Sequence, residues 1–159
     1  MTQRIRNCAK CYAALESTKL LAASGEHGPV KVTVNEMPVL ECAKHHRAPL
    51  HRDFMLWLIH ETRAREAQFA AGKEHGLIFK KHSCGACGKE LASRPERRQA
   101  FPFELTYEGK APFRLEIEMP LYKCGGCGKE QIRCVEDLHN HVPGAMVGIN
   151  DAAGFPHSG

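Results

Sequence analysis

Potential metal ligands recur at matched spacing in the two halves of this chain. Each half contains a Cys-x-x-Cys pair, followed later by a second pair that is separated by three residues from a preceding Glu-Met-Pro tripeptide. Internal self-similarity of this kind defines the folding unit of a chain. The recurring residues are Cys8, Cys11, Cys42 and His45 in the first half, and Cys84, Cys87, Cys124 and Cys127 in the second.

Each half therefore offers the four ligands of a structural zinc site. Structural zinc is tetrahedral, takes Cys and His ligands, and keeps no position open for substrate. The two residues inside a Cys-x-x-Cys pair form a tight turn that points both sulfurs at one ion, and Gly85 and Gly125 suit such turns. The sequence predicts two structural zinc ions per chain, whose binding contributes to folding.

The fourth ligand of the first half is assigned from the repeat. His45 aligns with Cys127 and is preferred, and its neighbour His46 is the rival. Two alternative roles for the cysteines are as buried free thiols, which are common in cores, and as disulfides, which need an oxidising compartment. Neither role accounts for the matched positions of seven of the eight cysteines.

The eighth cysteine, Cys134, has no counterpart in the first half. Together with His139 and His141 it offers a third, partial metal site. The alternative is that Cys134 packs in the core while the two histidines are solvated. Clusters of basic residues elsewhere, such as Arg97 and Arg98, are typical of solvated faces and also permit phosphate contact.

Length and charge narrow the class of protein. The chain has 159 residues, and units as small as each half usually need a metal to fold. A net charge of +4 permits nucleic-acid contact without requiring it. No signal-peptide pattern is visible at the start, and the longest apolar run, residues 54–59, is too short to span a bilayer. We therefore expect a cytoplasmic protein without a membrane partner.

Alternation of apolar and polar residues predicts a β-hairpin in each half. The strands are expected at residues 19–23 and 30–35, and at 103–107 and 113–119. When the halves are aligned on Glu-Met-Pro, the apolar positions of the second strands are out of phase, since Thr33 then matches Leu115. A one-residue slip reverses the faces of a strand, so an irregularity separates the halves at a position that the sequence does not reveal.

Helices are expected after each metal-binding unit. Pro49 and Gly72 suit the start and stop of a long helix over residues 49–71. A short helix over residues 131–141 is expected to end at Pro143. The remaining segment has no clear period, and is predicted to be disordered or to order only against a partner.

The predicted fold is a small α+β protein, with two zinc-stabilised β-hairpin units similar to zinc ribbons joined by a long helix. Whether the two units pack together is left open. The predicted divisions are a first zinc-finger unit (1–47), a connecting helix (48–76), a second zinc-finger unit with a short C-terminal helix (77–142) and a Gly/Ala-rich tail (143–159).

The first half of the long helix is apolar on every side, whereas a surface helix normally carries one apolar stripe. It is either clamped between the two units or available to a partner. The residues of this candidate partner-binding surface are Phe54, Met55, Trp57, Leu58 and Ile59.

The segment from Cys84 to Glu130 resembles the YgiT-type zinc finger, which is also the zinc-binding half of MqsA-like antitoxins. The likeness rests on Cys-x-x-Cys, a hairpin, and a Pro shortly before Cys124-Gly-Gly-Cys127-Gly-Lys-Glu, and it extends more loosely to residues 8–46. The resemblance implies structural metal bound by Cys84, Cys87, Cys124 and Cys127, and a finger that binds a partner protein. The chain departs from those antitoxins by lacking the pattern of a helix-turn-helix domain.

These features predict a non-catalytic, zinc-binding module for protein–protein interaction, acting as a scaffold or as an accessory subunit of a larger complex. No small-molecule substrate is evident, and an enzyme activity of its own is not expected. The alternatives are a zinc-ribbon protein that binds nucleic acid or regulates like an antitoxin, and a rubredoxin-like electron carrier, because tetrahedral sulfur ligation suits iron as well as zinc.

Overall fold

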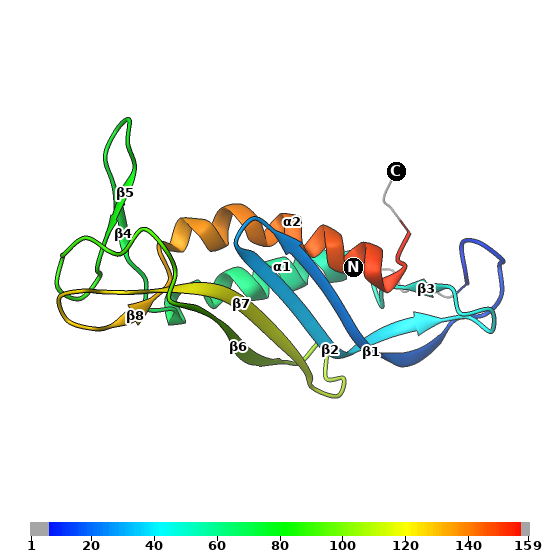
Figure 1. The fold of residues 1–159 in the computed structure, drawn as a ribbon. Coiled ribbons are helices and arrows are strands. Elements are labelled where there is room, and N and C mark those ends of the chain that lie inside the picture. The colour runs from blue at the N-terminus through cyan, green and yellow to red at the C-terminus, as the bar shows by residue number, and fades with distance from the viewer. Residues whose placement is uncertain (1–6, 157–159) are drawn as a thin grey trace.

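Two long β-hairpins, one from each half of the chain, form the centre of the computed structural model, which describes residues 7–156 (Figure 1). Their strands pair in the order β1-β2-β7-β6, short strands β3 and β8 pair with β2 and β7, and β4 and β5 form a separate two-stranded sheet. All of these strand pairs are antiparallel. The strands are β1 (Glu16–His27), β2 (Val30–Glu41), β3 (Arg47–Ala48), β4 (Lys73–His75), β5 (Lys81–Ser83), β6 (Arg97–Leu105), β7 (Phe113–Lys123) and β8 (Glu130–Gln131).

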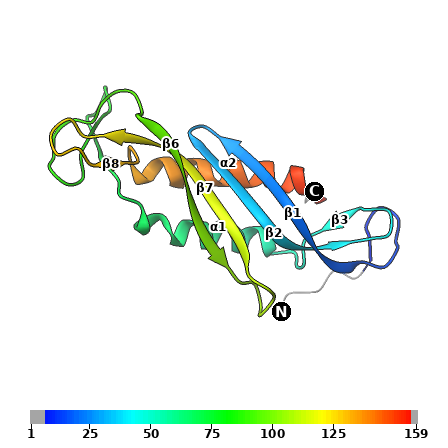
Figure 2. The same ribbon diagram turned by 60° about the horizontal axis from the view of Figure 1, so that its bottom comes forward.

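The helices are α1 (Phe54–Ala64), a 3₁₀ turn η1 (Glu66–Gln68) and α2 (Val135–Ala153). In the two views of the molecule, α1 and α2 lie side by side on one face of the central sheet (Figures 1 and 2). On β7, the residues that alternate with the buried ones include Arg114, Glu116 and Glu118, as expected of an antiparallel sheet that is covered on one side. Among the described residues, no helix is long and apolar enough to cross a membrane.

The prediction of two hairpins is confirmed, and the hairpins pack together directly. Strands β2 and β7 pair in the middle of the sheet, where Val32 lies opposite Ile117 and Val34 opposite Leu115. These side chains are fully buried and belong to one continuous core. The expectation of two units held together by a long helix is therefore corrected, because the sheet itself joins them.

The irregularity that the sequence left unplaced lies at Glu36 in β2. This residue has a φ of 58°, a left-handed conformation that is uncommon outside glycine. Before it, Val34 faces the core, and after it Met37 does so, which changes the alternation by one residue. No such break occurs in β7, where the odd-numbered residues from Phe113 to Leu121 are buried throughout. The altered phase of the two strands follows from this one backbone conformation.

The helix predicted over residues 49–71 is much shorter, because its ends are used in other contacts. Arg47 and Ala48 pair with β2, which holds the chain extended just before the helix. After α1 and η1 the backbone extends again, and Ala71 forms a parallel bridge with Ile132. Long-range pairing at both ends thus limits a segment whose local sequence favours helix.

The predicted tail is also corrected, because α2 continues through it to Ala153 with Pro143 inside the helix. The close contact between α2 and β1 requires glycine at two positions. A Cβ on Gly25 of β1 would lie 1.9 Å from the carbonyl oxygen of Ala145, and a Cβ on Gly148 would lie 2.7 Å from the Cα of Gly25. Proline lacks a backbone N–H and disfavours helix interiors, and close packing of α2 on β1 stabilises the helix despite it. After the helix, residues 154–156 include the buried Phe155, and residues 157–159 of the predicted tail lie outside the described residues.

The apolar side chains of α1 are mostly packed inside the molecule. Phe54 and Leu58 are fully buried, and the Phe54 ring meets Tyr107 at 4.9 Å between centroids. Met55, Trp57 and Ile59 are partly buried against the same core. The helix packs beside α2 against the core shared by both hairpins, with Leu56 exposed, and the partner-binding role of its partly buried residues stays a prediction.

Candidate metal centres

The antiparallel pairing of β2 and β7 places the two sets of cysteines at opposite ends of the sheet (Figure 2). Each of these strands runs directly into the second ligand pair of its half, at Cys42 and at Cys124. Because antiparallel neighbours run in opposite directions, their C-terminal ends lie at opposite ends of the sheet, and the two ligand sets are kept apart. The chain therefore carries two separate ligand clusters rather than one binuclear centre.

The second cluster consists of Cys84, Cys87, Cys124 and Cys127. The Sγ atoms of Cys84 and Cys127 are 3.6 Å apart, and those of Cys87 and Cys124 are 3.4 Å apart. These separations are far longer than a disulfide of about 2.05 Å, and they approach the roughly 3.8 Å edge of a tetrahedron with metal–sulfur bonds of about 2.3 Å. All four thiols are free and converge as ligands of a single ion would.

The first cluster consists of Cys8, Cys11, Cys42 and His46. The Sγ atoms of Cys11 and Cys42 are 3.7 Å apart, and His46 Nδ1 lies 3.5 Å from the Sγ of Cys8. His45 is instead 79% exposed and its Nδ1 contacts Glu41 at 3.1 Å. The assignment of His45 as the fourth ligand is therefore corrected to His46.

The reason for the change is a shorter turn. In three of the four ligand turns, the amide of the first cysteine donates to the carbonyl of the residue five positions later. The fourth residue after the cysteine then has a positive φ, and these residues are Tyr12, Gly88 and Gly128. At Cys42 the amide donates to the carbonyl of His46, only four residues later. The left-handed position, with a φ of 65°, then falls on His45. His45 thus matches Gly128 in conformation, and His46 is the next residue able to face the cluster.

Hydrogen bonds to sulfur favour the thiolate form in the second cluster. The Nε2 of Gln131 donates to the Sγ of Cys84 at 3.2 Å, and the Ala86 amide donates to the same sulfur at 3.3 Å. The hydrogen bonds from Gln131 and from the Cys87 amide lower the pKa of Cys84 to about 6, although burial acts to raise it. Gln131 is itself buried, and its Oε1 accepts from the Gly85 amide at 2.8 Å. Sequence patterns did not indicate this residue, since it lies outside the ligand spacing.

The pKa shifts of the other cysteines differ in direction, because their neighbours differ. Against the lowering effect of the Lys89 amide, the neighbouring Cys124 sulfur and burial raise the pKa of Cys87 to about 11. In the first cluster, burial acts to raise the pKa of Cys8, but the Cys11 and Lys10 amides outweigh it and lower that pKa to about 6. A cation bound at either cluster would displace the protons that remain on its thiols.

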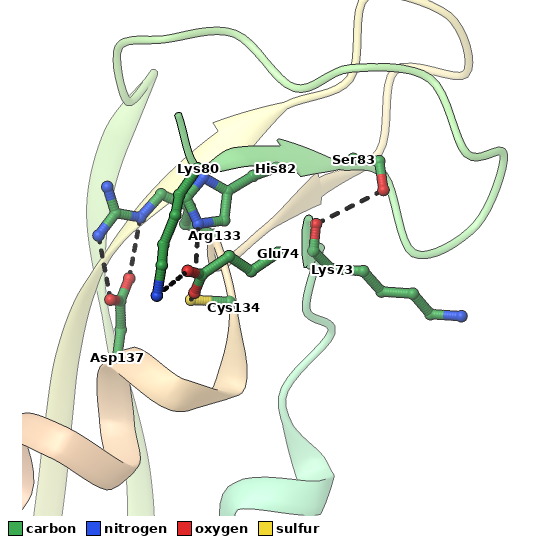
Figure 3. Close-up of polar contacts among 8 residues, drawn as sticks. All are labelled: Lys73, Glu74, Lys80, His82, Ser83, Arg133, Cys134 and Asp137. Atoms are coloured by element: carbon green, nitrogen blue, oxygen red, sulfur yellow. Dashed lines mark hydrogen bonds and ion pairs between the residues drawn. The ribbon is translucent and has the colours of Figure 1, made fainter. Parts of the chain in front are cut away.

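Cys134 does not meet the histidines that were considered for it. His139 contacts Arg63 and lies near Glu66, and His141 lies against His27. Cys134 converges instead with Glu74 and His82, two residues that the sequence analysis did not group with it (Figure 3). Burial is the main cause that lowers the pKa of His82, together with the nearby Arg133.

The two four-residue clusters can each hold a metal ion, and their donor sets fill every position of a tetrahedron. A cation held in this way would fix the loops at each end of the sheet and present no open position to a substrate. The sulfur-rich donors suit zinc, and the all-sulfur second cluster also suits iron. Comparison of the chain with protein-family models, with curated proteins and with solved structures finds no match.

Proposed function

We propose that this chain is a non-catalytic, zinc-binding module for protein–protein interaction, and that it acts as a scaffold or accessory subunit of a larger assembly. Two closed clusters with no open coordination position support a structural role for zinc. The free thiols favour the reducing cytoplasm as the compartment. The likeness of the second half to the YgiT-type finger adds a family in which a structural zinc unit binds another protein.

The observation that carries the interaction role is the tip of the β4–β5 hairpin. Leu77, Ile78 and Phe79 follow one another there and are 101%, 85% and 81% exposed. Single exposed apolar residues are common on proteins, whereas a contiguous patch marks a binding surface. In Figure 1 this hairpin projects away from the rest of the molecule, so its tip can enter a recess in another protein.

The charges beside the tip indicate what that recess contains. Three lysines and one glutamate lie on the hairpin strands and the adjoining turn. Glu74 is paired with Lys80 at 2.9 Å, and Lys81 lies 3.9 Å from Glu90, so a single net positive charge remains among these residues. The remaining positive charge favours a partner whose apolar pocket has an acidic rim. We infer that the tip supplies the buried anchor and that the lysines steer the encounter.

The α1 surface that the sequence suggested is a weaker candidate. Met55, Trp57 and Ile59 are partly open, and Met55 and Ile59 line a groove of about 240 Å³ together with residues of α2. Leu56 is the exposed apolar residue of this helix, at 70%. It provides a matched control, because it tests an exposed apolar position on another element.

The test is co-purification of the full chain from its own cells, with a photo-crosslinker at Ile78. We expect a stoichiometric companion that crosslinks at Ile78, that is lost when Leu77, Ile78 and Phe79 are all changed to Ser, and that is retained in Leu56→Ser. The metal content should stay unchanged in both variants, which shows that they are folded. A monomeric chain with no companion would refute the proposal, as would tip-dependent binding to lipid vesicles alone.

Nucleic-acid binding is the second outcome that the experiment distinguishes. Several basic side chains are already paired with acids, such as Arg97 with Glu130 at 2.7 Å and Arg98 with Glu118 at 2.9 Å. Such pairing reduces the charge available to phosphates. Co-purified nucleic acid whose binding weakens steeply with salt would favour this alternative, and a coloured iron protein would favour electron transfer.

A further inference from the structure

A third group of metal-ligating side chains lies where the β4–β5 hairpin meets the start of α2. One donor atom each of Glu74, His82 and Cys134 lies within 4.8 Å of the other two. Figure 3 shows these side chains converging from β4, from β5 and from the residue that precedes α2. We propose that they bind a third divalent metal ion, of the class that accepts sulfur, nitrogen and oxygen ligands together.

The strand register brings the oxygen and nitrogen donors together. Glu74 and His82 lie directly opposite each other in the β4–β5 pair, so their side chains share a face. His82 Nε2 and Cys134 Sγ each lie 3.9 Å from the same oxygen, Glu74 Oε2. These separations are slightly longer than the roughly 3.3–3.8 Å edges of a tetrahedron around an ion with bonds of about 2.0–2.3 Å. A small inward movement of the side chains completes the site.

The backbone holds the third donor against the hairpin. The Gly72 amide donates to the Ile132 carbonyl, and the Ile132 amide donates to the Ala70 carbonyl, both at 2.9 Å. A Cβ on Gly72 would lie 2.5 Å from the carbonyl oxygen of Arg133, so the two segments touch without an intervening side chain. Cys134 comes next and is buried, which fixes its sulfur beside the strands before any ion binds.

The neighbouring cations leave one carboxylate oxygen available. Lys80 contacts the other oxygen, Glu74 Oε1, at 2.9 Å, and its side chain is 67% exposed. Arg133 is engaged in two hydrogen bonds with Asp137, at 3.0 and 3.1 Å. Lys80 therefore competes for Glu74 without occupying Oε2, and it reduces the affinity of the site for a metal.

The donor set and the environment define what would bind. One thiolate, one imidazole and one carboxylate suit zinc, and three protein ligands leave a position for water, unlike the two closed clusters. With three protein ligands in place of four, and with Lys80 competing for Glu74, this site is expected to be the weakest of the three.

The test is the zinc stoichiometry of the full-length protein, measured by native mass spectrometry during titration against a competing chelator. Wild type should bind a third, weaker equivalent. Cys134→Ser and Glu74→Gln should each lose that equivalent and keep the first two. Lys80→Met should bind it more tightly, an increase that mere structural damage would not produce.

Glu90→Gln is the matched control, because Glu90 is an exposed carboxylate that lies 3.9 Å from Lys81 and is outside the group. It should retain all three equivalents. Saturation of wild type at two equivalents would overturn the third site, and so would a third equivalent that survives in both Cys134→Ser and Glu74→Gln. These results do not depend on whether the hairpin tip binds a protein.

Discussion

At the scale of single residues, the choice between two adjacent histidines shows how a backbone conformation selects a ligand. His45 occupies the left-handed position that closes the turn after Cys42, and this conformation directs its side chain toward Glu41 and solvent. His46 follows the turn and faces Cys8. Alignment of the repeat by residue count assigned the ligand incorrectly, because this turn is one residue shorter than the other three.

Substitution of the two histidines should separate their roles. His46→Ala removes a ligand, so the first cluster should lose metal affinity by more than the about 10–100-fold that loss of an outer hydrogen-bond partner costs. His45→Gly should leave affinity unchanged, because glycine adopts positive φ without strain. Competition with a chromophoric chelator measures both. Equal losses in the two variants would return His45 to the ligand set.

At the scale of elements, the contact between β1 and α2 explains the glycine and alanine content of the last segment. Gly25 faces the backbone of Ala145 and of Gly148 so closely that neither glycine has room for a Cβ. The helix ends at Gly154, whose φ of 74° is typical of a C-terminal cap. Small residues therefore serve to bring a helix onto a strand, although a lack of periodicity suggested an unstructured tail.

Gly25→Ala should destabilise the protein by about 3 kcal/mol, at the upper end of the cost of overpacking. The added methyl group would collide with backbone, which cannot rotate away as a side chain can. The midpoint of chemical denaturation at saturating zinc measures the effect. Gly125→Ala is the control, because no atom lies within 4 Å of the added Cβ. Similar midpoints for the two variants would contradict the close contact between β1 and α2.

At the scale of the whole molecule, one sheet connects two distant clusters, yet the buried residues beside the second cluster form a separate small group. That group comprises Cys84, Leu91, Tyr122 and Cys124, and the main core comprises residues of both hairpins and both helices. Loss of metal from the second cluster should therefore unfold the loops at that end of the sheet and leave the main core folded.

Cys124→Ser tests this division. We expect it to lose one metal equivalent and to expose the amides of residues 84–91 and 124–131 to exchange, while β1, β2 and α2 keep their protection. Hydrogen exchange with mass spectrometry resolves the three regions. Loss of protection throughout the sheet would show that the second metal supports the entire core.

The sequence by itself determined what depends on neighbours along the chain. The cysteine spacing identified seven of the eight residues of the two clusters, because a Cys-x-x-Cys turn is built from a few adjacent residues. Apolar alternation located both hairpins, because side chains alternate with a period of two in any strand. The strands extend beyond the expected bounds, except that β6 ends at Leu105, because pairing within each hairpin continues to Glu16 opposite Glu41 and to Arg97 opposite Leu121.

Only the tertiary structure decided the features that depend on distant segments. The pairing of β2 with β7, the continuation of α2 beyond Pro143, and the meeting of Glu74 and His82 with Cys134 all join parts of the chain that no local pattern relates. The apolar side chains of α1 fitted a core helix and an open surface equally well. Packing against the core buried Phe54 and Leu58 and left Leu56 exposed, because only the faces of a helix that meet other elements are covered.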